Sequence, residues 1–492
     1  MFESAELGHK ISKANYKKEV PALREALLDA QLELRQRAGF QVIILISGVD
    51  GAGKGETVNI LNEWMDPRHI RTHALDDPTD EELDRPVMWR YWRILPPKGE
   101  IGILFRSWYS APIKEHITGK IKNSELDQQI ERINRFEKML TDEGALVLKF
   151  WLHLAKEQQL TRLKSLEKDP KTRWRVSPRD WKNFKIYDKF RLITEHVLRR
   201  TSTSEAPWNI IEGADPRYRY LAVGKAVLQA LRARLDDGEP SPPAQPAVAV
   251  MPHIDSLSVL KRLDLSLRTG KEKFGDELEK YQGRLNLATR HENFRKISVI
   301  AVFEGWDAAG KGGSIRRITG ALDARLYNIV QIAAPTEEER AQPYLWRFWR
   351  HIPRRGRFAI FDRSWYGRVL VERVEGLCSQ SDWKRAYSEI NDFEGQLVRN
   401  GTVLVKFWLH ISRDEQLQRF QEREKTGFKR FKITGEDWRN RDKWDAYEVA
   451  VCDMIDRTST EIAPWTLVEA NDKYYARIKV LRTLCEAIER NL

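Results

Sequence analysis

The sequence predicts an α/β protein made of two tandem domains, each with a parallel sheet covered by helices on both faces. Three observations predict it: a length of 492 residues, long segments that occur twice, and apolar runs that alternate with helix-period segments. A chain of this length can bury two hydrophobic cores. Hydrophobic residues make up 41% of it and charged residues 32%, which is typical of globular proteins.

The two halves of the chain are copies of one another. The segment "GWDAAGKGG" (305–313) repeats "GVDGAGKGE" (48–56) after 257 positions, and the same offset aligns "FRSWY" with "DRSWY" and "LVLKFWLH" with "VLVKFWLH". No insertion or deletion separates these matches. We therefore predict a first domain at 1–235, a Pro-rich linker at 236–254 and a second domain at 255–492.

Four apolar segments in each copy are expected to be strands. They are rich in β-branched residues and nearly continuous, as in parallel strands buried on both faces. The expected strands are 41–48, 102–105, 146–153 and 208–213 in the first copy, and 297–305, 358–361, 403–410 and 465–470 in the second. Helix-period segments such as 126–144 lie between them, and strand, helix and strand in this order predict a parallel sheet covered by helices.

The formal net charge of +12 should attract polyanions, which include nucleic acids, anionic membranes and inorganic phosphate chains. No apolar run reaches the length of a membrane span, and the N-terminal segment "MFESAELGHKISKANYKK" has neither a secretory signal nor a transit-peptide pattern. The spacing of Cys378, Cys452 and Cys485 matches no metal cluster. A reducing cytoplasmic location without disulfides is the expectation.

Each copy contains the pattern G-x-x-x-x-G-K between an expected buried strand and a helix-period segment. This context is typical of a P-loop, in which backbone N–H groups surround a phosphate and the lysine binds its outer oxygens. A Gly-rich turn without a ligand is the alternative, but the strand, the lysine and the duplication all favour the P-loop. The expected phosphate-binding residues of the second copy are Gly305, Ala308, Ala309, Gly310, Lys311, Gly312 and Gly313.

A carboxylate must replace a hydroxyl as metal ligand in this loop. Gly312 stands where Ser or Thr usually holds Mg²⁺, so Asp307 inside the loop and Asp362 at a strand end are the expected ligands. For Asp362, capping of a turn is the alternative. The first copy has Phe105 in place of Asp362 and therefore looks degenerate.

Four segments of the second copy resemble the polyphosphate kinase 2 family: "GWDAAGKGG", "APTEEERAQPYLWRFWRHIP", "FDRSWYGRVLVERVEG" and "REKTGFKRFKITGEDWRNRDKWDAY". The tandem arrangement is similar to the two-domain class of this family, the AMP phosphotransferases, and the resemblance covers both repeats. It implies two P-loop kinase-like domains, each with a helical lid, of which the second is catalytic.

The resemblance also implies roles for individual residues. Asp307 and Asp362 would bind Mg²⁺ and Lys311 would bind phosphate. Arg363, Arg368 and Arg423 would balance charge in a loose phosphoryl-transfer transition state. Further implied phosphate contacts, for which solvated surface charges are the alternative, are Arg316, Arg317, Lys429 and Arg430. The charged positions that change in the first copy become Phe105, Ala111, His116 and Leu166.

The expected activity is Mg²⁺-dependent transfer of the terminal phosphate of inorganic polyphosphate to AMP, which gives ADP. Polyphosphate and AMP or ADP are then the partners, with neither nucleic acid nor membrane. The alternatives are a polyphosphate-driven kinase that converts ADP to ATP, an ATP-dependent small-molecule kinase, and a non-catalytic protein that binds polyphosphate or nucleic acid. The first half is expected to be structural and to pair with the second as single-domain family members pair between chains, and a homo-oligomer is a further expectation.

Overall fold

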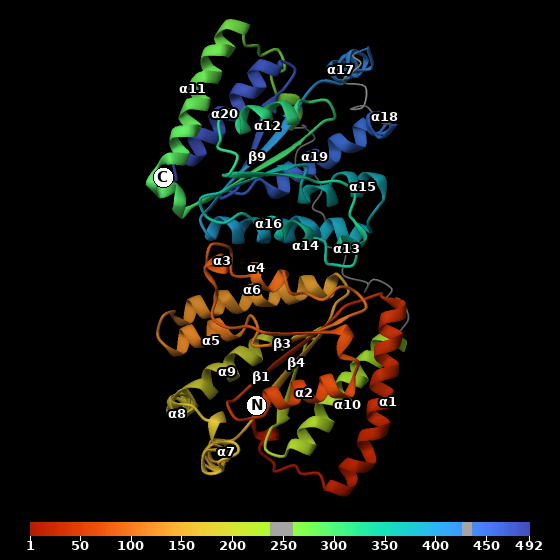
Figure 1. Ribbon diagram of the computed structural model, residues 1–492. Coiled ribbons are helices and arrows are strands. Elements are labelled where there is room, and N and C mark those ends of the chain that lie inside the picture. Colours follow the sequence, from red (N-terminus) through yellow and green to blue (C-terminus); the bar gives the residue numbers. More distant parts are fainter. Residues whose placement is uncertain (237–258, 426–434) are drawn as a thin grey trace. The chain divides into compact units, whose positions relative to one another are not determined.

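The computed structural model describes residues 1–236, 259–425 and 435–492, and these residues form two five-stranded parallel sheets (Figure 1). The strands of the first sheet are β1 (Val42–Gly48), β2 (Ile70–Ala74), β3 (Ile101–Phe105), β4 (Leu146–His153) and β5 (Trp208–Glu212). The strands of the second sheet are β6 (Ser298–Gly305), β7 (Tyr327–Gln331), β8 (Phe358–Asp362), β9 (Thr402–His410) and β10 (Trp465–Glu469). Their orders, β2-β3-β1-β4-β5 and β7-β8-β6-β9-β10, are the same, and the predicted α/β class is confirmed.

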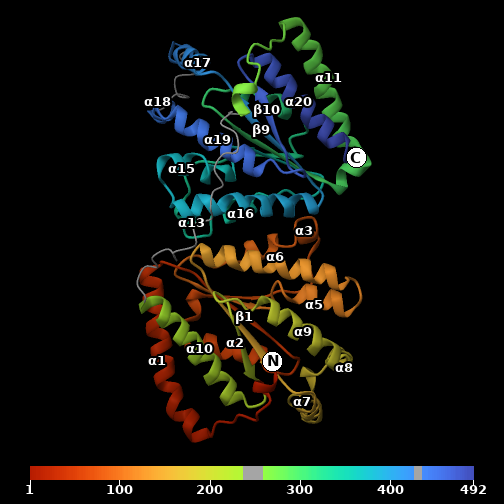
Figure 2. The same ribbon diagram turned by 180° about the vertical axis from the view of Figure 1, so that it is seen from behind.

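Helices cover both faces of the first sheet. Helices α1, α2 and α10 pack on one face, and α5, α6 and α9 pack on the other (Figures 1 and 2). The helices of the first repeat are α1 (Lys13–Arg37), α2 (Lys54–Trp64), α3 (Asp80–Leu83), α4 (Trp89–Trp92), α5 (Ser110–Ile117), α6 (Asn123–Asp142), α7 (Lys156–Lys168), α8 (Pro178–Lys185), α9 (Tyr187–Thr201) and α10 (Pro216–Asp236), with short 3-10 turns at Glu3–Ala5, Pro67–His69 and Arg173–Arg175.

The second sheet is covered in the same way. Helices α11, α12 and α20 lie on one face, and α15, α16 and α19 lie on the other. The helices of the second repeat are α11 (Lys271–Arg290), α12 (Lys311–Thr319), α13 (Glu337–Arg340), α14 (Trp346–Trp349), α15 (Val371–Glu375), α16 (Gln380–Arg399), α17 (Arg413–Lys425), α18 (Gly435–Asp442), α19 (Trp444–Thr458) and α20 (Lys473–Glu489), with 3-10 turns at Val259–Arg262, Glu292–Lys296 and Trp365–Arg368. None of the helices in the described ranges combines the length and apolar character that a membrane span needs.

The chain divides into two compact units. One comprises Met1–Asp77, Arg90–Ser241 and Thr336–Trp346, and the other comprises Pro78–Trp89, Pro242–Pro335 and Arg347–Leu492. Each unit therefore includes a short segment from the other repeat. Of the predicted linker, only Asp236, the last residue of α10, lies inside the described residues.

The strands that the sequence predicted are all present, but two more exist. β2 and β7 are edge strands, and each exposes most of its side chains. A half-exposed edge strand lacks the continuous apolar run that identifies a buried parallel strand. This is why apolar runs revealed four strands in each repeat rather than five.

The P-loop of each repeat leaves the central strand through a glycine that no other residue can replace. Gly305 has φ +149°, and a Cβ built on it would lie 2.5 Å from the carbonyl oxygen of Leu409 on β9. Gly48 in the first repeat has φ +148° and would bring a Cβ to 2.2 Å from the carbonyl oxygen of Leu152. The backbone approach between neighbouring strands therefore requires glycine at the start of each loop.

A buried ion pair connects β9 to α16. Lys406 Nζ donates to Glu394 Oε2 at 2.8 Å, and the two side chains are 0% and 1% exposed. The same carboxylate accepts from Trp365 Nε1 at 3.0 Å and from the Tyr366 hydroxyl at 2.6 Å, and Lys406 also donates to the carbonyl oxygen of Thr458. Burial raises the pKa of Glu394 and lowers that of Lys406. Each of these buried polar groups therefore keeps its hydrogen-bond partners only while the other groups stay in place.

Replacing Lys406 by Met should destabilise the second domain by about 3 to 5 kcal/mol, because Glu394 is then buried without its counter-charge. Urea unfolding followed by tryptophan fluorescence measures this loss. Adding Glu394→Gln should restore part of it, because the amide oxygen still accepts from Trp365 and Tyr366. As a control, Arg284→Met breaks the exposed pair with Glu489 and should cost less than about 1 kcal/mol. Equal losses for the two single variants would contradict the proposed role of burial.

Aromatic rings pack around Trp306, the second residue of the second loop. The indole of Trp306 stacks on Trp444 with ring centroids 3.7 Å apart and an angle of 9° between the planes. Trp306 Nε1 donates to His410 Nδ1 at 3.0 Å. Burial lowers the pKa of His410 to about 4, so this imidazole is neutral and can accept the bond.

The stability of the second domain should therefore fall on acidification. An unfolded histidine titrates near 6.5, so below that pH the unfolded chain binds a proton that the folded chain excludes. Between about pH 6.5 and about pH 4 His410 should remove up to about 1.4 kcal/mol per pH unit from the free energy of unfolding. Chemical unfolding of wild type and His410→Gln across this range should give a shallower slope for the variant. Parallel pH profiles for the two proteins would exclude this contribution.

Candidate active site

The second loop connects β6 to α12, and two of its carbonyl oxygens accept hydrogen bonds from the ammonium group of its own lysine. Lys311, the first residue of α12, donates through Nζ to the carbonyl oxygens of Gly305 at 2.8 Å and Trp306 at 3.3 Å. Ala308 and Gly310 adopt positive φ angles of 63° and 109°, which turn successive N–H groups toward one side of the loop. The local structure is thus that of a phosphate-binding loop at a helix N-terminus.

The carboxylate of Asp307 is held from two sides. Arg363 Nη2 donates to Oδ1 at 3.0 Å, and Asn440 Nδ2 donates to Oδ2 at 3.0 Å. Burial raises the pKa of Asp307, but the charges of Lys311 and Arg363 outweigh this effect, and the pKa lies below the ordinary value. The side chain is 13% exposed. It is therefore ionised at neutral pH and still reachable from solvent.

Asp362 ends β8 beside the end of β6, with its Cα in register with Phe303. The next residue, Arg363, has a left-handed φ of 63°, which is uncommon outside glycine, and its amide donates to the carbonyl oxygen of Phe303 at 3.0 Å. Backbone strain of this kind is concentrated at functional sites. Across this turn Arg363 reaches Asp307, so the structure brings the loop and the strand-end motif together.

Glu304, directly before the loop, is a carboxylate that sequence reasoning missed. It is buried and accepts from Ser364 Oγ at 2.8 Å. Burial raises its pKa, against the influence of the nearby Lys311. The first repeat has Ser47 at this position. The internal alignment was therefore the signal that could have revealed Glu304.

Two helices after β9 contact the loop. From α17, Gln416 Nε2 donates to the carbonyl oxygen of Asp307 at 3.1 Å. From α18 comes Asn440, whose Oδ1 accepts from the Tyr447 hydroxyl at 3.2 Å while its Nδ2 holds the Asp307 carboxylate. Neither Gln416 nor Asn440 was expected as a site residue from sequence, although both recur in the first repeat as Gln159 and Asn183, which donate to Asp50.

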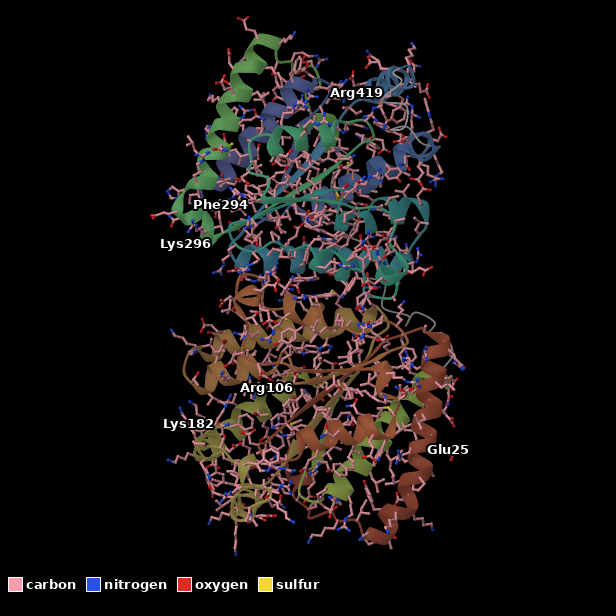
Figure 3. All side chains as sticks on the ribbon, in the orientation of Figure 1. Glu25, Arg106, Lys182, Phe294, Lys296 and Arg419 are labelled. Atoms are coloured by element: carbon pink, nitrogen blue, oxygen red, sulfur yellow. The ribbon has the colours of Figure 1, made fainter. Side chains whose placement is uncertain are left out.

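Arg419 of α17, labelled in Figure 3, was also missed. Its guanidinium is buried and donates to the carbonyl oxygens of Ala308 at 2.9 Å and Ala309 at 3.2 Å in the loop, and to those of Ala470 and Asn471 after β10. It therefore joins the loop to the end of β10. A lone arginine on a charged helix gives no sequence signal for such a role.

The remaining predicted arginines differ in their surroundings. Arg423 of α17 lies near enough to Asp307 for that carboxylate to counter the lowering of the Arg423 pKa by burial. Arg368 forms ion pairs with Glu372 at 2.9 Å and Asp382 at 3.9 Å, which belong to α15 and α16 rather than to the loop.

Among the predicted phosphate contacts, Arg317 is half-buried on α12 and donates to the carbonyl oxygen of Gly313 at 3.3 Å, whereas Arg316 is exposed. Lys429 and Arg430 lie outside the described residues.

The acidic groups suit a metal that takes few protein ligands. Within the described ranges no group of three or more His, Cys, Asp and Glu side chains is placed to hold a metal ion. Mg²⁺ needs only one or two carboxylates and completes its shell with water and phosphate oxygens. Asp307 and Asp362 could supply these two, although both oxygens of Asp307 now accept bonds from Arg363 and Asn440.

The first loop keeps the amide contact to its aspartate, because Asn183 Nδ2 donates to Asp50 Oδ2 at 2.7 Å, but its charged contacts differ. Lys54 Nζ donates to Asp50 Oδ1 at 3.2 Å, so the loop aspartate is paired with its own lysine. Arg106, labelled in Figure 3, follows Phe105 and pairs with Asp76 at 3.2 Å. The first domain therefore has neither the strand-end carboxylate nor the arginine contact to the loop aspartate.

Comparison with known proteins agrees with this architecture. The family model described as polyphosphate kinase 2 matches residues 10–238 and 268–492. A relative from Pseudomonas aeruginosa, named polyphosphate:AMP phosphotransferase, is 60% identical over 489 residues, which cover 99% of both chains. A relative from Acinetobacter johnsonii with the same name is 40% identical over 470 residues, which are 94% of this chain and 95% of that one.

A solved structure described as a polyphosphate kinase 2 from Pseudomonas aeruginosa superposes with a TM-score of 0.90 at 57% sequence identity and covers 100% of this chain and 99% of that one. The resemblance drawn from the motifs is confirmed, and the chain belongs to the polyphosphate kinase 2 family.

Proposed function

We propose that the chain transfers the terminal phosphate of inorganic polyphosphate to AMP and releases ADP. Full-length relatives that carry the name polyphosphate:AMP phosphotransferase support this acceptor and this donor. The observation that carries the proposal is the meeting of Lys311, Asp307, Arg363 and Asp362 at the carboxyl ends of β6 and β8. Ligands of parallel α/β sheets bind at this edge.

The reaction needs no covalent intermediate on the protein. A phosphate oxygen of AMP forms a bond to the terminal phosphorus of the chain, and the bond from that phosphorus to the bridging oxygen breaks. The leaving polyphosphate, one unit shorter, keeps the electron pair of the broken bond. Such a loose transition state depends on positioning and on charge balance.

The cationic side chains supply that charge balance. Lys311 and the loop N–H groups bind a phosphate at the start of α12, and Arg363 and Arg423 face the transferring group from β8 and α17. Removing one such donor typically lowers the rate by 10²- to 10³-fold, as an order of magnitude. Asp307 fixes Arg363 through the bond at 3.0 Å, so the loop aspartate also orients a cation.

A divalent metal, Mg²⁺ in our proposal, would be held by Asp307 and Asp362. When bound, it neutralises negative charge on the phosphate oxygens of both substrates. Asp307 follows β6 in the loop, and Asp362 ends the adjacent strand β8. Both aspartates therefore lie at the carboxyl ends of the strands.

We further propose that residues 255–492 form the catalytic domain and residues 1–235 a structural one, joined by 236–254. Phe105 at the position of Asp362 and the pairing of Asp50 with Lys54 support this division. The cytosolic location, the pairing of the halves and a homo-oligomer stay predictions.

An assay of ADP formation from AMP, polyphosphate and Mg²⁺ tests the proposal. Wild type should form ADP, and Asp307→Asn and Asp362→Asn should each lose at least about 100-fold in kcat, because each removes a negative charge at the metal and phosphate site. Asp50→Asn, the matched change in the first loop, should retain wild-type turnover. Chelation with EDTA should stop the reaction, and added Mg²⁺ should restore it.

Parallel reactions with ADP as acceptor and with ATP as donor separate the alternatives. Preference for ADP over AMP would assign the other acceptor, and equal activity with ATP would reject polyphosphate as the specific donor. If Asp362→Asn were as active as wild type, the site assignment would fall.

A further inference from the structure

The first turn of α2 holds a carboxylate among arginines. Glu56 Oε2 accepts from Arg219 Nη2 at 2.7 Å. Its Oε1 lies 3.2 Å from Arg162 Nη2 and 3.4 Å from Arg175 Nη1. Arg219 is fully buried, and its guanidinium presses against Gly53 of the loop. The Glu56 carboxylate therefore places a negative charge of the protein itself beside the first loop. We call the surroundings of Glu56, and of Gly313 at the matching position of the second domain, the corner of each domain.

The same corner of the second domain contains other arginines, Arg317 and Arg477, and no such anion. Gly313 stands at the position of Glu56, and Arg477 Nη2 lies 3.2 Å from where a Cβ of Gly313 would be. Arg317 donates to the carbonyl oxygen of Gly313 at 3.3 Å. Within the described part of the chain, no Asp or Glu forms an ion pair with Arg317 or Arg477.

Electrostatics agrees with this crowding of positive charge. Burial, the charge of Arg317 and that of Arg419 all lower the pKa of Arg477. Tyr474 and Asp472 act in the opposite direction, but Oδ1 of Asp472 accepts from the amide of Tyr475 at 2.7 Å and so caps α20. Arg419 is itself paired with Glu415 at 2.6 Å, whereas no ion pair in the described part of the chain compensates Arg317 or Arg477.

We propose that Arg477, together with Arg317, binds a phosphate group of a substrate at the first turn of α12. Carboxylate and phosphate both bind arginine through pairs of N–H donors, so Glu56 marks in the first domain the place that a substrate phosphate occupies in the second. The proposal rests on the proposed function, since the phosphate belongs either to polyphosphate or to AMP. By the same geometry, Glu56 closes the first loop to such a ligand.

Calorimetric titration of the full-length chain with inorganic tripolyphosphate, and separately with AMP, tests the role of Arg477. Arg477→Gln should weaken tripolyphosphate binding by about tenfold or more, because it removes a charged donor. Arg490→Gln, the same change at an exposed position after α20, should stay within about twofold of wild type. A selective loss of AMP binding would assign the phosphate to the nucleotide instead.

Unchanged affinity for both ligands in Arg477→Gln would overturn the proposal. The titrations need no turnover, so they separate this inference from the proposed function. A chain that forms no ADP but whose tripolyphosphate binding depends on Arg477 would refute the activity and keep the phosphate site.

The converse change tests the first domain. Glu56→Gly places there the residue that the second domain has, and it should raise the number of tripolyphosphate molecules bound per chain from one to two. Glu56→Gln keeps the size of the side chain but removes its charge. It is the control for misfolding of Glu56→Gly, and it should bind the second tripolyphosphate in part. Wild type that already binds two molecules, or a Glu56→Gly chain that still binds one, would show that Glu56 does not close the corner.

Discussion

The buried pair of Lys406 and Glu394 fixes the segment that carries half of the site. Trp365 and Tyr366 follow Asp362 and Arg363 after a single residue, Ser364, and both donate to the Glu394 carboxylate. Leaving that carboxylate without its donors would cost several kcal/mol. The strand end and its left-handed turn are therefore held by the core, so that Asp362 and Arg363 stand on a rigid support while their own side chains remain accessible.

The same network exists in the first domain, where Lys149 and Glu137 pair at 2.7 Å and Trp108 and Tyr109 donate to the carboxylate. It explains why "SWY" occurs in both repeats although the residues around it differ. Folding requires the tryptophan and the tyrosine, whereas only phosphate chemistry requires an aspartate before them. Duplication within one chain thus separates residues kept for the fold from residues kept for the site.

The strands and site residues that have a local sequence signal could be predicted from the sequence. Those that depend on contacts across the fold could not. Continuous apolar runs identified the buried strands, but β2 and β7 expose most of their side chains and resemble loops. Glycine spacing and strand ends located Asp307, Lys311 and Asp362. Asn440 and Arg419, in contrast, act on the loop from more than a hundred positions away, through an amide and backbone carbonyl contacts that no spacing rule describes.

Local charge, rather than the glycine and lysine pattern, distinguishes the two P-loops. Both have the lysine, the glycines and the strand-to-helix context, but the first surrounds a carboxylate with arginines, whereas in the second no ion pair among the described residues compensates Arg317 or Arg477. Two unit charges 4 Å apart interact by roughly 4 kcal/mol near a protein surface, and about 1.4 kcal/mol is a factor of ten in affinity. In our proposal, one carboxylate at this corner would therefore be enough to weaken phosphate binding by orders of magnitude. A P-loop pattern establishes the backbone that can hold a phosphate, and the charge around it determines whether a polyanion enters.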